Sequence, residues 1–253
     1  MRGLLRLLKS EEIKSRHTAL FWIHIILPAT GAVLFLVYYR FANWSNMDEI
    51  KAYLQVVSCI WPFLCGVICS ISEEMEADGG YQTFFCLSRR KFQSILAKWC
   101  FLALAGLFSC LIAIMGFATV YRLFSGGEVY NLEVYLLNTV IIWIGQVVVY
   151  LVHLMLAFSF GKSISICIGI LGTLSAFLML TSLGDGIWMF FPWSWSGRFC
   201  SNLLLYMTEK NYKTEINPMI VHELEICIVV FLILTVTAFL WFGKYEGRRM
   251  GAE

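Results

Sequence analysis

Cysteine and histidine are the residue types in this chain that could bind a transition metal, and it has nine and four of them. Cys65 and Cys69 lie one helical turn apart, a spacing that could bring two thiolates to one ion. No other Cys or His stands at the spacing of a zinc site. Most of the cysteines lie inside apolar segments, where cysteine packs as a small hydrophobic residue. The sequence therefore predicts no metal site.

A second candidate is the tripeptide Gly161-Lys162-Ser163, which matches the end of a phosphate-binding loop. The full motif needs a glycine five residues before Gly161, where this chain has Leu156, and a strand leading into the loop. The flanking segments are long apolar runs instead. The chain is therefore not expected to bind ATP through this motif.

The stretch EEMEAD, residues 73–78, is similar to the Glu-Glu-x-x-x-Arg signature of intramembrane CAAX-type proteases. Asp78 stands where that motif needs arginine. Of the four histidines, only His24 and His153 lie well inside apolar segments, although such a site needs histidines on several spans. An intramembrane protease-like enzyme stays the less favoured alternative, and no catalytic residue is assigned.

Four further residues are candidates for a substrate pathway. Gln146 and His153 are seven residues apart and share a helix face, so they either contact substrate or hydrogen-bond between helices. Trp193 and Trp195 belong to the aromatic stretch GDGIWMFFPWSWSGRF, which also contains Trp188. This composition favours an aromatic belt at a membrane boundary, with substrate contact as the alternative.

The elements that position these residues are membrane-spanning helices. Hydrophobic residues make up 59% and charged residues 14% of the chain, whereas soluble domains have roughly 45–50% and about 25%. We expect an all-α integral membrane protein with six transmembrane helices, because a span needs roughly 20 apolar residues. The predicted spans are about 18–39, 52–72, 95–120, 135–160, 164–184 and 223–243.

The distribution of basic residues predicts the orientation. Six spans place both termini on one side, and 13 of the 19 Lys and Arg residues fall on that side, which the positive-inside rule assigns to the cytoplasm. Residues 1–17 are predicted to form an interfacial amphipathic helix, with Leu4, Leu5, Leu8 and Ile13 on one face. Residues 18–253 form the predicted six-span domain.

The fifth predicted span carries small residues at every fourth position. This small-x-x-x-small pattern allows helices to approach closely. We interpret the stripe as a subunit interface, with lipid-facing small residues as the alternative. Its members are Gly161, Ser165, Gly169 and Thr173.

Charged residues gather in the connection between the second and third predicted spans. A short helix is expected just after Gly79-Gly80, with aromatic and aliphatic side chains on one side. Acids precede this helix and bases follow it, which complements the helix dipole. We interpret it as a docking element for a soluble partner, since the acids would be repelled by anionic lipid.

The same connection resembles that of the membrane subunits of type-2 ABC exporters. The resemblance is carried by Glu73-Glu74, Glu76, Gly79-Gly80-Tyr81-Gln82, Leu87-Ser88-Arg89-Arg90 and Lys98. It implies that the short helix is a cytoplasmic coupling helix, which lies in a cleft of a separate ATPase subunit. The implied docking residues are Glu73, Glu74, Glu76, Gly79, Gly80, Tyr81, Phe84, Phe85, Leu87, Arg89 and Arg90.

Two other stretches, LLKSEEIKSRHTALFWIHIILPATGAVLFLVYY and FPWSWSGR, look like permease subunits of lantibiotic-immunity transporters. This resemblance implies a bacterial cytoplasmic-membrane permease that expels cationic antimicrobial peptides. It also implies that ATP and Mg²⁺ bind in the partner ATPase, and that a second permease subunit, related or identical, completes the pathway. A type-2 permease for a drug, an ion or a lipid stays the alternative.

Overall fold

The computed structural model describes residues 2–86, 91–125, 130–208 and 217–247, and within these ranges the chain forms helices and no strands. In chain order they are α1 (Arg2–Ser15), α2 (Ala19–Tyr39), α3 (Asn46–Asp78), α4 (Gln82–Cys86), α5 (Lys91–Phe124), α6 (Leu132–Phe160), α7 (Lys162–Met179), the 3-10 turns η1 (Ser182–Gly184) and η2 (Trp188–Phe190), α8 (Pro192–Thr208) and α10 (Asn217–Lys244).

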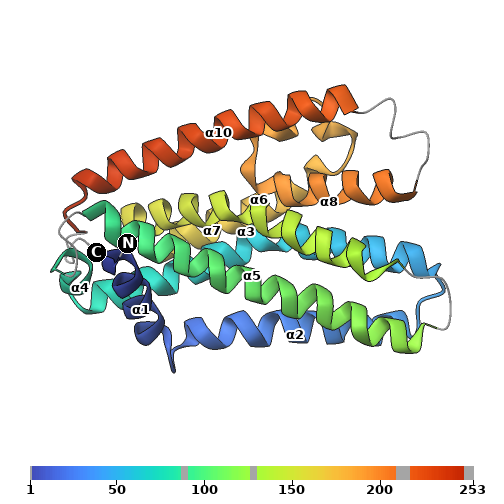
Figure 1. The fold of residues 1–253 in the computed structure, drawn as a ribbon, viewed down its shortest axis with the longest axis horizontal. Coiled ribbons are helices and arrows are strands. Elements are labelled where there is room, and N and C mark those ends of the chain that lie inside the picture. The colour runs from blue at the N-terminus through green and yellow to red at the C-terminus, as the bar shows by residue number, and fades with distance from the viewer. Residues whose placement is uncertain (1, 87–90, 126–129, 209–216, 248–253) are drawn as a thin grey trace.

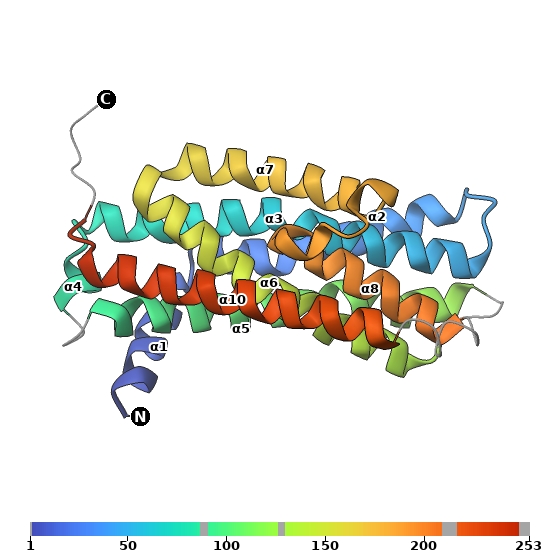
Figure 2. The same cartoon turned by 90° about the horizontal axis from the view of Figure 1, so that it is seen from above.

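Six of these helices are long and apolar enough to cross a membrane, namely α2, α3, α5, α6, α7 and α10. They run side by side along the long axis of the molecule (Figures 1 and 2). The predicted all-α architecture with six transmembrane helices is therefore confirmed. The second and third spans are longer than expected, with 33 and 34 residues in α3 and α5, so both extend beyond the roughly 20 residues that a bilayer requires.

The two ends of the bundle carry different elements. Figure 1 shows α1, α4, the turn between α6 and α7 and the last turn of α10 at one end of the bundle, here called the α4 end. The far end carries the connection between α2 and α3. Helix α1 packs mainly against α5. Its Leu5 and Ile13 are 64% and 59% exposed, whereas Leu7 is buried, so apolar surface of α1 is free to contact lipid.

Helix α8 lies within the region that we expected to be one long connection. It packs in the far half of the bundle against α6, α3 and α7 (Figure 2). The predicted aromatic belt is wrong for Trp188 and Trp195, which are 2% and 5% exposed. Both indoles instead hydrogen-bond inside the protein, Trp188 to Glu223 and Trp195 to the Met189 carbonyl.

The core of the bundle is built on α3, which packs most extensively against α7. A Cβ on Gly169 would lie 2.9 Å from the Pro62 carbonyl oxygen, and the Thr173 hydroxyl accepts a hydrogen bond from the Phe63 amide at 3.1 Å. Ser165 is fully buried. The small-residue stripe thus brings two helices close together, but its partner is α3 of the same chain, so this face is not open to a second subunit.

Gly161, the first residue of the predicted stripe, has a different role. It separates α6 from α7 with φ +88° and ψ −177°. Residues with a side chain are essentially excluded from this backbone region. Gly161 therefore allows the chain to reverse in one residue, so that α7 returns along α3.

Candidate functional site at the α4 end of the bundle

A tight turn ends α3 and begins α4. The Gly80 and Tyr81 amides donate hydrogen bonds to the Ala77 and Glu76 carbonyls, both at 2.8 Å. Gly80 has φ +60° and Tyr81 has φ +56°. Positive φ is natural for glycine but uncommon for a residue with a side chain. The contacts of the Tyr81 side chain must therefore hold this backbone in place.

The Tyr81 side chain has such contacts. Its hydroxyl donates a hydrogen bond of 2.5 Å to a carboxylate oxygen of Glu73, and both residues are buried. Burial and the neighbouring carboxylate raise the pKa of Tyr81, because both disfavour the phenolate form. Tyr81 therefore remains a hydrogen-bond donor at physiological pH, and it joins the start of α4 to the last turns of α3.

Helix α4 rests on aromatic side chains from the ends of α6 and α10. The Phe84 and Phe158 ring centroids are 5.2 Å apart, and the Tyr81 and Tyr245 centroids are 6.0 Å apart. Tyr245 also donates a hydrogen bond to the Phe158 carbonyl at 3.1 Å. Such ring pairs stabilise packing beyond their buried area. A displacement of α4 would therefore also displace the ends of α6 and α10.

This packing changes how the predicted docking residues can act. Tyr81 and Phe84 are 4% and 2% exposed, so their side chains face the bundle and not a partner. On α4, Gln82 and Cys86 are exposed and Phe85 is half-buried. The docking role itself stays a prediction. Three of the residues predicted for it lie outside the described residues: Leu87, Arg89 and Arg90.

The acids of the charged stretch lie on the last turns of α3 and have separate partners. The exposed Glu74 pairs with Lys162 of α7 at 3.0 Å. Glu76 is 1% exposed, and one of its carboxylate oxygens contacts two ammonium groups, that of Lys14 at 2.7 Å and that of Lys98 at 2.9 Å. Buried charges in proteins are found paired in this way.

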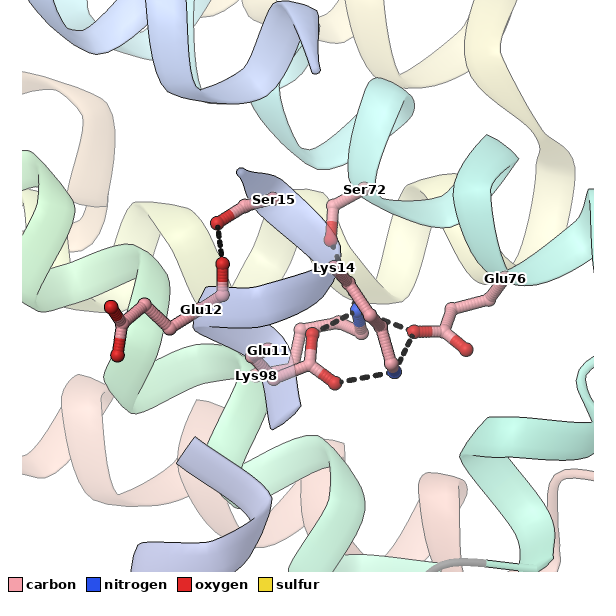
Figure 3. Close-up of polar contacts among 7 residues, drawn as sticks. All are labelled: Glu11, Glu12, Lys14, Ser15, Ser72, Glu76 and Lys98. Atoms are coloured by element: carbon pink, nitrogen blue, oxygen red, sulfur yellow. Dashed lines mark hydrogen bonds and ion pairs between the residues drawn. The ribbon is translucent and has the colours of Figure 1, made fainter. Parts of the chain in front are cut away.

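Figure 3 shows that these contacts form one ion-pair cluster, defined by Glu11 and Lys14 of α1, Glu76 of α3 and Lys98 of α5. Glu11 accepts from Lys14 at 2.8 Å and from Lys98 at 2.6 Å. Two ammonium and two carboxylate groups balance in charge. The Ser72 hydroxyl, 3.2 Å from the Lys98 ammonium, adds a further acceptor. The cluster therefore joins α1, α3 and α5 next to the turn that leads into α4.

The sequence interpretation placed Glu76 among the docking residues and did not identify its partners. A signal for one of them was present, because Lys98 lies inside the predicted third span. An ionisable residue within a span is expected to have a partner of opposite charge. Glu11 and Lys14 had no such signal, since an amphipathic terminal helix usually carries solvated charges.

The structure brings together two of the four substrate-pathway candidates. The Trp193 indole donates to His153 Nε2 at 3.3 Å, so Nε2 is the acceptor nitrogen and Nδ1 carries the proton. Nδ1 lies 3.3 Å from the Ser165 hydroxyl. This arrangement joins α6, α7 and α8 through interhelical hydrogen bonds.

The other two candidates have separate partners. The Gln146 side-chain oxygen accepts from the Cys110 thiol at 3.5 Å, and the Trp195 indole donates to a backbone carbonyl. A role in a substrate pathway stays a prediction for all four candidates. Within the described ranges, no three His, Cys, Asp or Glu residues form a group that could hold a metal ion.

The described residues thus form a bundle of six helices long enough to span a membrane, with a short helix at the turn between the second and third spans. The family model described as "ABC-2 family transporter protein" matches residues 7–176, from within α1 to near the end of α7. The chain belongs to this ABC-2 family. Searches of curated proteins and of solved structures found no match.

Family membership establishes what the chain does at a coarse level. It is a multi-pass membrane protein and the membrane subunit of an ABC transporter. The family also implies an ABC ATPase as a partner, and its members often act as dimers. The chain is thus a transport membrane subunit.

Proposed function

We propose that the chain is the permease subunit of an ATP-driven exporter that expels cationic antimicrobial peptides, and that α4 is the element contacted by the ATPase. The observation that carries the docking proposal is the construction of α4. It projects Gln82 and Cys86 outward while Phe84 is buried against α6. A partner can contact the exposed side of such a helix, and the buried Phe84 makes the bundle move with the helix when the partner displaces it.

Movement of α4 would reach the spans by two routes. One runs through the aromatic contacts of Tyr81 and Phe84 with the ends of α6 and α10. The other runs through α3 and the ion-pair cluster, which joins it to α1 and α5. Interfaces of packed side chains transmit small shifts as rigid-body movements. For this coupling to operate, the ATPase would have to make different contacts with α4 in its different nucleotide-bound states.

The peptide substrate is supported by the sequence resemblance to lantibiotic-immunity permeases and by charge. The predicted topology assigns nine acids and six bases to the side of the membrane opposite the termini. An excess of negative charge attracts a cationic peptide, and salt weakens this attraction. Export of a drug, an ion or a lipid is the competing assignment, and family membership accommodates it equally.

The remaining parts of the proposal concern location and partners. The chain would lie in a bacterial cytoplasmic membrane with both termini inside, since the predicted topology assigns 13 of the 19 Lys and Arg residues to the side of the termini. ATP and Mg²⁺ would bind in the ATPase. A second permease, related or identical, would complete the pathway and would contact a surface other than the small-residue face of α7.

Docking is tested by co-purification of the ATPase with variants of α4. Gln82→Arg changes an exposed side chain and leaves Phe84 in place, so the complex should be lost while the fold persists. Lys162→Gln, at an exposed position on the same end of the bundle, is the matched control and should retain the ATPase. If the complex survives Gln82→Arg and a second α4 variant, Cys86→Arg, docking through α4 is wrong.

The substrate is tested by growth. Cells with and without the gene are exposed to a panel of cationic lantibiotics and to small hydrophobic drugs. The proposal predicts protection against the peptides, and this protection should disappear in a strain whose ATPase cannot hydrolyse ATP. Protection against the hydrophobic drugs alone would contradict the peptide assignment and favour the alternative.

A further inference from the structure

A cavity of about 560 Å³ opens at the far end of the bundle. It lies between the last turn of α2, the first turn of α3 and the last turn of α5, and therefore at the level where the spans leave the hydrocarbon. Its lining combines ionisable, aromatic and aliphatic side chains. The members used below are Val33, Val37, Tyr39, Arg40, Glu49, Tyr121 and Phe124.

The wall of this cavity holds a buried carboxylate. Glu49 is 5% exposed and accepts a hydrogen bond of 2.5 Å from the Tyr121 hydroxyl. No Lys, Arg or His in the described part of the chain lies within ion-pair distance of it. An ionised carboxylate removed from water needs a cation or several donors. One tyrosine leaves most of its acceptor capacity unused.

A second buried polar group in the cavity also lacks a partner. Tyr39 is 7% exposed, and its hydroxyl oxygen makes no hydrogen bond with any residue that the structure describes. Buried polar atoms in native structures nearly always have a partner, so an orphaned one needs an explanation. A ligand with several hydrogen-bond donors would satisfy Glu49 and Tyr39 together.

The rim of the cavity has the opposite charge. Arg40 is exposed, and its guanidinium lies 5.7 Å from the Phe124 ring centroid. Below it, Val33 and Val37 are 56% and 52% exposed on the membrane-facing side of α2. The cavity thus presents a carboxylate inside, a guanidinium at the rim and an apolar track leading into the bilayer.

We propose that this cavity binds the headgroup of phosphatidylethanolamine from the surrounding leaflet. Its primary ammonium has three N–H donors for Glu49 and Tyr39. Its phosphate, two carbons away, would lie near Arg40, and its acyl chains would follow Val33 and Val37. A peptide lysine would also satisfy Glu49, but it brings a second cation toward Arg40. The rim charge therefore favours a zwitterionic lipid.

The test uses the purified transporter complex in nanodiscs of equal parts phosphatidylethanolamine, phosphatidylcholine and phosphatidylglycerol. The complex is then extracted into mild detergent, and the retained lipid is measured by mass spectrometry. Phosphatidylethanolamine should be enriched, because the quaternary ammonium of phosphatidylcholine has no N–H to donate. Glu49→Gln should reduce this enrichment about tenfold, whereas Glu133→Gln, at an exposed far-end position, should leave it unchanged.

Two further measurements keep the result interpretable. Thermal unfolding of Glu49→Gln shows whether the fold persists, which we expect because glutamine still accepts from Tyr121. Tyr39→Phe removes an unpartnered hydroxyl, so it should lower retention without lowering stability. Equal retention of the three lipids by the unsubstituted complex would overturn the proposal. Displacement of radiolabelled hexalysine by excess unlabelled peptide, with no lipid retained, would assign the cavity to a cationic peptide instead.

Discussion

Replacing Lys98 by methionine should destabilise the protein strongly. Lys98 is 2% exposed and pairs with Glu11 and Glu76. Methionine fills most of the same volume but removes the positive charge, so two carboxylates would share the single ammonium of Lys14. Breaking a buried ion pair by removing one partner costs about 3–5 kcal/mol. The free energy of unfolding, measured by denaturation in mixed micelles, should fall by that amount.

A double-mutant cycle separates the loss of charge balance from the loss of side-chain packing. Glu76→Gln leaves the cluster with one excess positive charge, and the combination of Lys98→Met with Glu76→Gln restores neutrality. The double variant should therefore be less destabilised than the sum of the single variants, by about 0.5–3 kcal/mol.

The exposed pair of Lys162 and Glu74 provides the control for this cycle. Its side chains are 52% and 45% exposed, and such surface pairs contribute about 0–1 kcal/mol. Lys162→Met should therefore change the free energy of unfolding by no more than this. If Lys98→Met is equally mild, or if the cycle is strictly additive, the cluster does not hold α1, α3 and α5 together.

Two other predictions concern backbone packing and the turn before α4. Gly169→Ala should destabilise the protein by about 1–3 kcal/mol, because the added carbon would lie 2.9 Å from the rigid Pro62 carbonyl. Gly116→Ala, where the added carbon meets nothing within 4 Å, should instead be neutral or stabilising, and equal effects in a thermal melt would refute the close approach. Tyr81→Phe should cost about 1.5–3 kcal/mol by removing the bond to the Glu73 carboxylate, and unchanged stability would show that this bond does not hold the turn.

The sequence predicted the spans well because a bilayer imposes a simple rule on them. About twenty apolar residues are needed to cross it, and the six runs satisfied that rule. It could not predict how far α3 and α5 continue beyond the hydrocarbon. The extra turns at the end of α3 contain the buried Glu76, which is compatible with helix there only because it pairs with Lys14 of α1 and Lys98 of α5.

Helix α8 was missed because its composition allows two interpretations. Tryptophan suits the membrane boundary as well as a core in which its N–H finds a partner. The Trp188 indole donates to Glu223, which is far away in the sequence, and the Trp195 indole donates to the carbonyl of Met189 in the 3-10 turn η2. Neither partner could be predicted from the spacing of the residues. Pro192 at the first helical position was the available signal, since proline is favoured there.

The small-residue stripe illustrates a different limit. The spacing of Ser165, Gly169 and Thr173 correctly indicated that another helix lies close to α7. Spacing alone does not identify that helix, and the structure assigns it to α3 of the same chain. The prediction of the docking residues has the same limit. The helical spacing of the apolar residues placed Phe84 on α4, but it did not show that Phe84 packs inward against Phe158.

Contact between α4 and the ATPase is the central claim, and the native cysteines test it directly. Cys86 on α4 and Cys167 on α7 are the exposed thiols among the nine cysteines. A short thiol-to-amine crosslinker applied to the assembled complex should join this chain to the ATPase through Cys86. Cys86→Ser should abolish that product and Cys167→Ser should leave it intact. A crosslink that persists without Cys86, or that never forms although the ATPase co-purifies, would contradict docking through α4.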